Sequence, residues 1–121
     1  MEHELSAFYD ITHGHGLAIL TPRWLEYCLD ESNVYKYVQF GVNVFGIDPK
    51  LPAMEIAHKA IDALADFFFK DLGLKSTLPE VGIDETNFEI MAGKSVCFDT
   101  LYGFKPLKQQ DVVKIYKMCM K

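Results

Sequence analysis

The chain has 121 residues, the length of one ordinary domain, and because half of them are hydrophobic it is expected to fold around a core. Its net charge of −5 argues against a nucleic-acid-binding surface, which needs clustered lysine and arginine. It has no apolar run long enough to cross a membrane, and its N-terminus lacks the basic and apolar regions of a signal peptide.

The three cysteines, Cys28, Cys97 and Cys119, are odd in number and form no C-x-x-C pair. This usage favours free thiols in a reducing cytoplasm over a disulfide framework or a zinc knuckle. No general base lies near any of them in the sequence, so none is assigned as a nucleophile.

The first part of the chain predicts three helices. A short helix or turn covers about residues 2–8, and the chain breaks at residues 9–12. A second helix runs from about residue 13 to 29, with Pro22 predicting a kink or a restart. Asn33 can cap a third helix that reaches Phe45. Here Phe40, Val42 and Val44 alternate as a strand would, so the strand alternative stays open.

Three further helices follow. Pro52 suits the first turn of a fourth helix, whose apolar stripe continues to Leu72 and ends at Gly73. Asp84 can cap a fifth helix that ends near Lys94, and residues 103–106 form a loop. The last helix places four residues inward: Val112, Ile115, Tyr116 and Cys119. No segment shows sustained strand-length alternation, so the sequence predicts an all-α bundle, a single domain over residues 1–121.

Two histidines stand out at the start of the sequence. His3 and His13 are ten residues apart within MEHELSAFYDITHGHG. On one straight helix, such residues lie about 15 Å apart along the axis and about 80° apart around it. One metal ion therefore cannot bridge them unless the chain turns between them.

The residues around these histidines resemble the metal-site segment of the iron-dependent alcohol dehydrogenases, the butanol dehydrogenase branch in particular. In that family the segment has the form His-x-x-x-His-Glu-Leu-Ser-Ala, a short polar turn, and Asp-x-x-His-Gly. Later stretches resemble the family's C-terminal helical domain in the same order, namely GVNVFGIDP, TLPEVGID and GFKPL. The resemblance covers nearly the whole chain, from Glu2 to about Met118.

The resemblance implies separate roles for the two histidines. His13 matches a metal ligand, and His3 matches a histidine beside nicotinamide and substrate that assists proton transfer. The family pattern places another ligand histidine four residues before His3, and an aspartate and a histidine ligand earlier still. These 121 residues thus offer one ligand of four, whereas stable sites need three or four donors. We therefore expect no firmly bound metal here.

The remaining candidates have plainer interpretations. His15 points about 200° away from His13 on a helix, so it is not expected to be a second ligand. His58 next to Lys59 is expected to be a structural or solvated residue. Asp10 has two possible roles, orienting a histidine or capping the next helix, of which capping is favoured.

By the resemblance, the chain is the C-terminal catalytic-metal part of an oxidoreductase that transfers a hydride between NAD(P)H and small alcohols or aldehydes. Fe²⁺ is the expected ion, with Zn²⁺ as the alternative. No cofactor-binding residue is assigned, because the sequence has no G-x-G-x-x-G loop. The isolated chain is expected to be inactive, with a homodimer or a missing N-terminal domain as partner. The rival hypotheses are a truncated, self-associating, non-enzymatic helical module, and a part of a longer polypeptide in which Met1 is internal.

Overall fold

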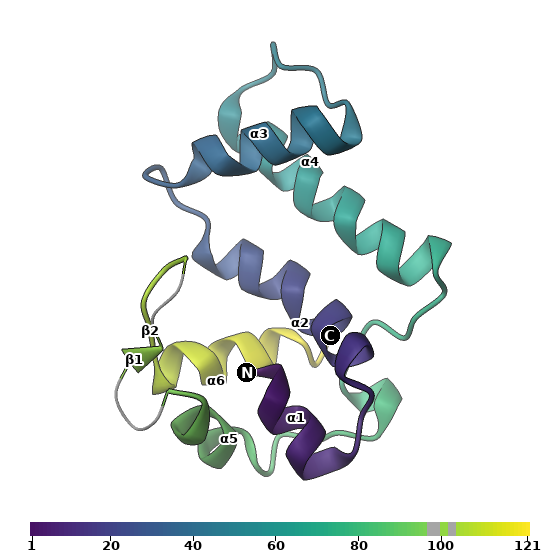
Figure 1. Cartoon of the computed structure of the whole chain (residues 1–121), viewed down its shortest axis with the longest axis vertical. Helices are drawn as coiled ribbons and strands as arrows, with labels where there is room; N and C mark the ends of the chain where they lie inside the picture. Colours follow the sequence, from purple (N-terminus) through teal and green to yellow (C-terminus); the bar gives the residue numbers. More distant parts are fainter. Residues whose placement is uncertain (97–99, 102–103) are drawn as a thin grey trace.

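The computed structural model describes residues 1–96, 100–101 and 104–121 (Figure 1). Within these ranges the chain forms six α-helices, which confirms the predicted all-α fold class. They are α1 (Glu2–Tyr9), α2 (His13–Cys28), α3 (Val34–Phe45), α4 (Ala53–Asp66), α5 (Phe88–Ser95) and α6 (Gln109–Met118). Smaller elements are a π-helical turn (Phe67–Asp71), a 3₁₀ turn (Pro79–Val81) and a two-residue antiparallel pair of β1 (Thr100–Leu101) with β2 (Leu107–Lys108).

The chain turns between α1 and α2, as the histidine spacing required. Asp10 ends α1 in the left-handed conformation, with φ of 54°, and its N–H donates to the Ser6 carbonyl at 3.1 Å. Aspartate is among the few non-glycine residues that adopt this conformation readily. The residue that caps α2 is Thr12, so the expectation that Asp10 caps the next helix is wrong.

Helix α2 passes through Pro22 without restarting. Proline has no N–H, so the carbonyl of Ala18 lacks its usual donor one turn later. Two side chains donate to the neighbouring carbonyls: the Thr21 hydroxyl to Leu17 at 2.6 Å and the Arg23 guanidinium to Ile19 at 3.0 Å. The helix is continuous from His13 to Cys28, so of the two predicted alternatives, a kink or a restart, the restart does not occur.

Helices α3 and α4 lie side by side at one end of the molecule (Figure 1). The strand alternative for residues 40–44 is wrong, because they are helical. Asn33 precedes α3 but makes no capping bond to it; its side chain instead donates to the Cys28 carbonyl at 2.7 Å. The predicted fourth helix is α4 continued by the π-helical turn, and Gly73 after it has φ of 71°.

The start of α5 differs from the prediction. Asp84 accepts the N–H of Thr86 at 3.0 Å and forms a local turn, while the helix begins only at Phe88. Short polar side chains often bond the backbone two residues on, which competes with helix capping. At α6, the Asp111 carboxylate accepts the N–H of Lys108 at 2.9 Å, so an aspartate in the first turn holds the helix start.

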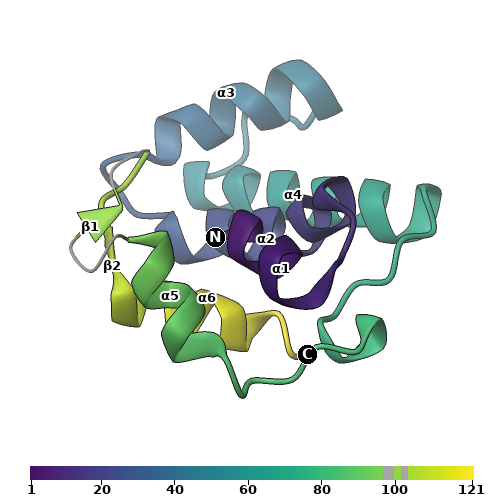
Figure 2. The ribbon, with the colours of Figure 1, turned by 60° about the horizontal axis from the view of Figure 1, so that its bottom comes forward.

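The main core lies between α1, α2, α5 and α6, which come from both ends of the chain (Figures 1 and 2). Phe88 and Tyr116 stack at its centre with ring centroids 5.3 Å apart, and Leu5 of α1 is fully buried there. The Tyr116 hydroxyl donates to the Met1 carbonyl at 2.7 Å. The four residues predicted to face inward from the last helix are all buried, which confirms that face.

Two sequence-based expectations fall on Cys97 and Gly103, which lie outside the described residues. Cys28 and Cys119 are free and buried. Across residues 1–96, 100–101 and 104–121, no helix is long and apolar enough to cross a membrane.

Candidate functional site

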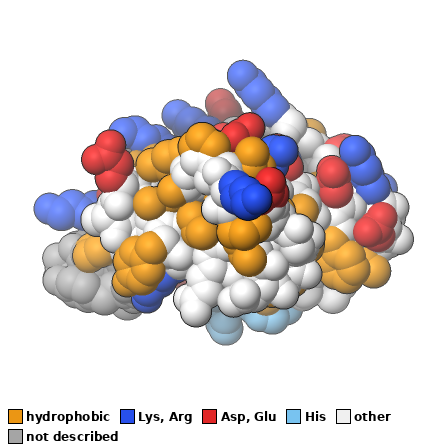
Figure 3. All heavy atoms as spheres, turned by 90° about the horizontal axis from the view of Figure 1, so that it is seen from above, with side chains coloured by type: hydrophobic (Ala, Val, Ile, Leu, Met, Phe, Trp, Pro, Cys, Tyr) orange, Lys and Arg blue, Asp and Glu red, His pale blue; other side chains and the backbone are white. Residues whose placement is uncertain are grey.

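The two singled-out histidines lie on consecutive helices that pack against each other. His3 is an exposed residue of α1, and His13 is the first residue of α2 with 64% of its side chain exposed. The reversal at Asp10 turns α2 back along α1 (Figure 2). Histidine side chains are visible together at one edge of the surface in Figure 3. The roles of His3 and His13 remain predictions.

The partner of His13 is a residue that the sequence did not single out. Its Nδ1 contacts the Glu2 carboxylate, whose side chain is only 2% exposed. The other carboxylate oxygen accepts the Ser6 hydroxyl at 2.6 Å. The sequence contains a signal for this contact. Glu2 is an acidic residue in the first turn of one helix, and that helix must fold back onto the glycine-rich start of the next helix, at Gly14 and Gly16.

The other two described histidines have separate surroundings. Nε2 of His15 bonds the carbonyl oxygen of Lys75 at 3.0 Å, which ties the start of α2 to the segment after the π-helical turn. Nε2 of His15 is therefore engaged by Lys75, and the exclusion of His15 as a ligand remains a prediction. His58 is exposed on α4, as expected of a solvated residue.

The described residues supply one candidate metal ligand, His13, but they do not form a complete metal site. His13 uses Nδ1 toward Glu2, which leaves Nε2 for another bond. In the part of the chain that the structure describes, no group of three or more His, Cys, Asp or Glu side chains comes together in a way that can hold a metal ion. A stable site needs three or four donors, so the remaining donors would have to come from outside these residues.

A small pocket adjoins Glu2 between α1 and α2. Its volume is about 220 Å³, and its lining is mainly apolar: Met1, Glu2, Leu17, Leu20, Thr21 and Trp24. A second apolar pocket of about 260 Å³ lies between α2, α3 and α4, where Phe104 packs edge-on against Trp24 with ring centroids 6.0 Å apart. Both pockets are lined mainly by apolar side chains, and both are smaller than the usual small-molecule site of about 300–1,000 Å³.

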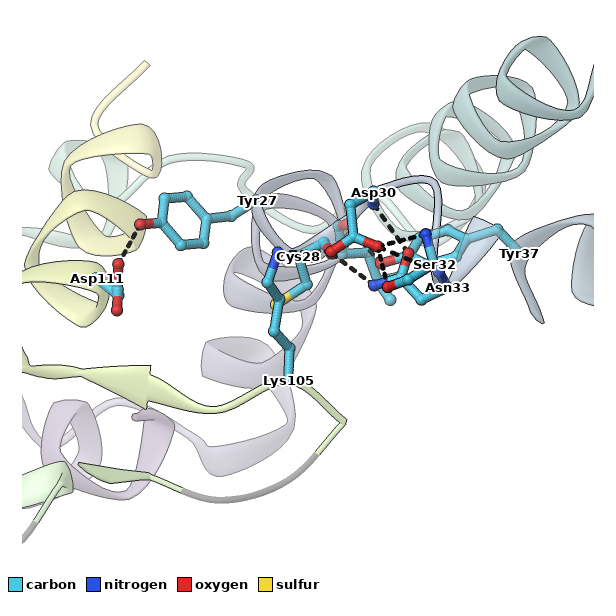
Figure 4. Close-up of polar contacts among 9 residues, drawn as sticks. Tyr27, Cys28, Asp30, Ser32, Asn33, Tyr37, Lys105 and Asp111 are labelled. Atoms are coloured by element: carbon cyan, nitrogen blue, oxygen red, sulfur yellow. Dashed lines mark hydrogen bonds and ion pairs between the residues drawn. The ribbon is translucent and has the colours of Figure 1, made fainter. Parts of the chain in front are cut away.

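A polar cluster formed by Asp30, Ser32 and Lys105 lies where α2 ends (Figure 4). Asp30 accepts the N–H and hydroxyl of Ser32 at 2.8 and 2.5 Å, and pairs with the Lys105 ammonium at 2.9 Å. These bonds, first those from Ser32 and then that from Lys105, hold the pKa of the Asp30 carboxyl well below its usual range. The cluster is a structural link between the end of α2 and the segment before β2.

Tyr27 and the two buried thiols, Cys28 and Cys119, have raised pKa values. Tyr27 donates to the Asp111 carboxylate, which raises the pKa of Tyr27 to about 12 and lowers that of Asp111 (Figure 4). Burial raises the pKa of the Cys28 thiol, and it raises that of Cys119 to about 12. A thiol that stays protonated is a poor nucleophile.

Comparisons with known proteins agree on one family. Residues 1–120 match the family model described as "Fe-containing alcohol dehydrogenase family, C-terminal". The chain is 51% identical to NADH-dependent butanol dehydrogenase B of Clostridium acetobutylicum and 47% identical to butanol dehydrogenase A of the same organism, each over 119 residues. Each alignment covers 97% of this chain and 30% of the relative, so the chain spans about a third of the relatives' length.

Solved structures show the same fold. The crystal structure of NADH-dependent butanol dehydrogenase A from Thermotoga maritima superposes with a TM-score of 0.82 at 30% identity, covering 99% of this chain and 31% of that one. A 1,3-propanediol oxidoreductase gives a TM-score of 0.83 at 26% identity, covering 98% and 31%. The matched parts of both structures share the arrangement of helices described above.

Proposed function

Because the chain belongs to the iron-containing alcohol dehydrogenase family and corresponds to its C-terminal domain, we propose that it forms the metal-binding part of an NAD(P)H-dependent alcohol dehydrogenase. The proposed substrates are small alcohols and aldehydes of the butanol class. Identity of 51% to a butanol dehydrogenase is the observation that carries this proposal.

His13 is the residue proposed to ligate the metal, through Nε2. The imidazole stands at the start of α2 with most of its side chain exposed, and Glu2 engages only Nδ1. Fe²⁺ is the proposed ion and Zn²⁺ the alternative, since imidazole suits both. His3 is the proposed proton-transfer residue, on the exposed face of the neighbouring helix.

The pocket beside Glu2 supports a short aliphatic substrate. It offers Leu17, Leu20 and Trp24 to an alkyl chain, in a volume of about 220 Å³. Glu2 lines this pocket and also contacts His13, so the pocket lies next to the proposed ligand. The free, buried Cys28 and Cys119 support a reducing compartment, and we propose the cytoplasm.

The 121 residues alone are proposed to be inactive, because they supply one ligand of a metal site and no assigned cofactor-binding residue. The test is a chimera in which this chain replaces the matching C-terminal 30% of the Clostridium butanol dehydrogenase B. With Fe²⁺ and NADH, the chimera should reduce butyraldehyde, whereas the isolated chain should not. His13→Ala should abolish the chimera's activity, and His58→Ala, at an exposed residue of α4, should leave it unchanged.

An inactive, well-folded chimera would overturn the proposal, and so would butyraldehyde reduction by the purified isolated chain. Retained activity in His13→Ala would overturn the ligand assignment alone.

One observation favours self-association as a second candidate. Helix α3 exposes 63% of Tyr35 and 61% of Val44, and hydrophobic side chains gather on the surface seen in Figure 3. Exposed apolar surface of this kind is often covered by a second copy or another domain. Gel filtration with light scattering tests it: a dimer supports self-association, and a monomer at all concentrations contradicts it.

A further inference from the structure

Glu2 differs from every other charged side chain in the described part of the molecule. It is the only charged residue there that is buried, at 4% exposure. One carboxylate oxygen faces the Ser6 hydroxyl on its own helix, and the other faces Nδ1 of His13 on the next helix. Burying a carboxylate is costly unless it is hydrogen-bonded, so these two contacts determine where it can lie.

Gly16 provides the space for this carboxylate. A Cβ atom at this position would lie 2.3 Å from Oε1 of Glu2 and 2.6 Å from its Cγ, closer than real Cβ atoms approach. Any side chain larger than hydrogen would therefore push the Glu2 carboxylate out of its place. By contrast, a Cβ at Gly14 has no neighbour within 4 Å.

We propose that Glu2 is a positioning residue that holds His13 in the tautomer with the proton on Nδ1 and the lone pair on Nε2. The Glu2 carboxyl group accepts the Ser6 hydroxyl through one oxygen and faces His13 through the other. As an acceptor toward His13, it requires Nδ1 of the ring to be the donor. A carboxylate bonded to the second nitrogen of a ligating histidine fixes the ring and its tautomer. The link to ligation rests on the proposed function; the tautomer does not.

The tautomer is measurable in the chain as it stands. Long-range ¹H–¹⁵N correlation spectra of the ¹⁵N-labelled 121-residue protein distinguish protonated from unprotonated ring nitrogens. Spectra are recorded at alkaline pH, in the range where the ring ¹⁵N shifts no longer change with pH. His13 should show a protonated Nδ1 and an unprotonated Nε2. His3, which is exposed, serves as the reference for an unconstrained ring. A His13 ring protonated mainly on Nε2 overturns the proposal.

Variants test whether Glu2 is the cause. In Glu2→Ala, the ratio of Nδ1–H to Nε2–H tautomer at His13 should fall about tenfold, since a hydrogen bond to a charged group is worth at least that factor. Gly16→Ala should lower the ratio in the same direction by displacing the carboxylate. The matched controls Glu4→Ala and Gly14→Ala should leave it unchanged. Glu2→Gln should keep most of the Nδ1–H tautomer, because its amide oxygen still accepts.

Backbone amide spectra identify variants that fail to fold. If Glu2→Ala unfolds, the wild-type measurement and the Gly16→Ala and Gly14→Ala pair still decide the matter. An unchanged His13 tautomer in folded Glu2→Ala or Gly16→Ala overturns the role of Glu2. The chimera assay is independent of these spectra: a fixed tautomer with an inactive chimera refutes the proposed function alone, and a mixed tautomer with an active chimera refutes the positioning role alone.

Discussion

The two ends of the molecule are held together in different ways. Among the residues that the structure describes, the main core contains sixteen buried residues contributed chiefly by α1, α2, α5 and α6, whereas α3 and α4 bury a smaller set of hydrophobic residues: Tyr37, Ile56, Ala57, Ala60 and Ile61. The main core joins residues far apart in sequence, as in the bond from Tyr116 to Met1. The packing of α3 on α4 joins neighbouring segments of the chain.

This difference predicts unequal stability within one chain. Elements with few buried apolar contacts open locally at lower free energy than the rest of a protein. We therefore expect α3 and α4 to open without disrupting the main core, which holds Glu2, His13 and their helices in place. The candidate site is built on the more stable region.

The largest expected effect is at the centre of the main core. Phe88→Ala removes a 2%-exposed ring that stacks on Tyr116, and should lower the free energy of unfolding by about 3–5 kcal/mol. Urea denaturation followed by circular dichroism measures this. Ile90→Ala on the same helix, at a side chain 53% exposed, is the control and should change stability by no more than about 0.5 kcal/mol. Equal effects would contradict the placement of the core.

A smaller and local effect is expected among the residues that α3 and α4 bury. Ile61→Ala should lower the free energy of opening α3 and α4 by about 2 kcal/mol, the lower end for such a truncation because Ile61 borders the apolar pocket between α2, α3 and α4 and is not enclosed on every side. Amide hydrogen exchange should become faster in α3 and α4 and stay unchanged in α6. If protection in α6 falls equally, the two regions unfold as one unit and the contrast between them disappears.

The smallest effect concerns the Asp30–Lys105 pair, which links the segment between α2 and α3 to the segment before β2. The pKa of Asp30 is lowered in the folded state, so its contribution is present above the ordinary aspartate pKa of 3.8 and is lost as the pH falls below it. Asp30→Asn should therefore be less stable than the wild type at neutral pH, and the difference should shrink as the pH drops below about 4. Thermal unfolding over this pH range measures it. A constant difference would contradict the charge-based link, and the exposed Asp62→Asn is the control.

Regular helices were predictable from the sequence because local signals determine them. The stripe of Ala57, Ala60 and Ile61 is buried as its spacing indicates. The start of α5 was missed because Asp84 can bond the backbone either as a helix cap or as a turn, and the two are alike in sequence.

The candidate site was predictable only in part. The turn of the chain between His3 and His13 followed from their spacing, but Glu2 was missed because its burial depends on how α1 packs on α2. The exclusion of His15 as a ligand followed from helical geometry, while its bond to Lys75, sixty residues away, depends on tertiary structure. Long-range packing therefore decides which polar residues become buried.

The bond between Tyr116 and Met1 has a consequence for the order of synthesis. The ribosome makes α1 before α6, but the core in which Leu5 is buried also contains residues of α6. Helices α3 and α4 can pair as soon as they emerge, since their partners are adjacent in the nascent chain. The main core must wait for α6, so the segment that carries His3 and His13 emerges well before the helix that completes its apolar cover.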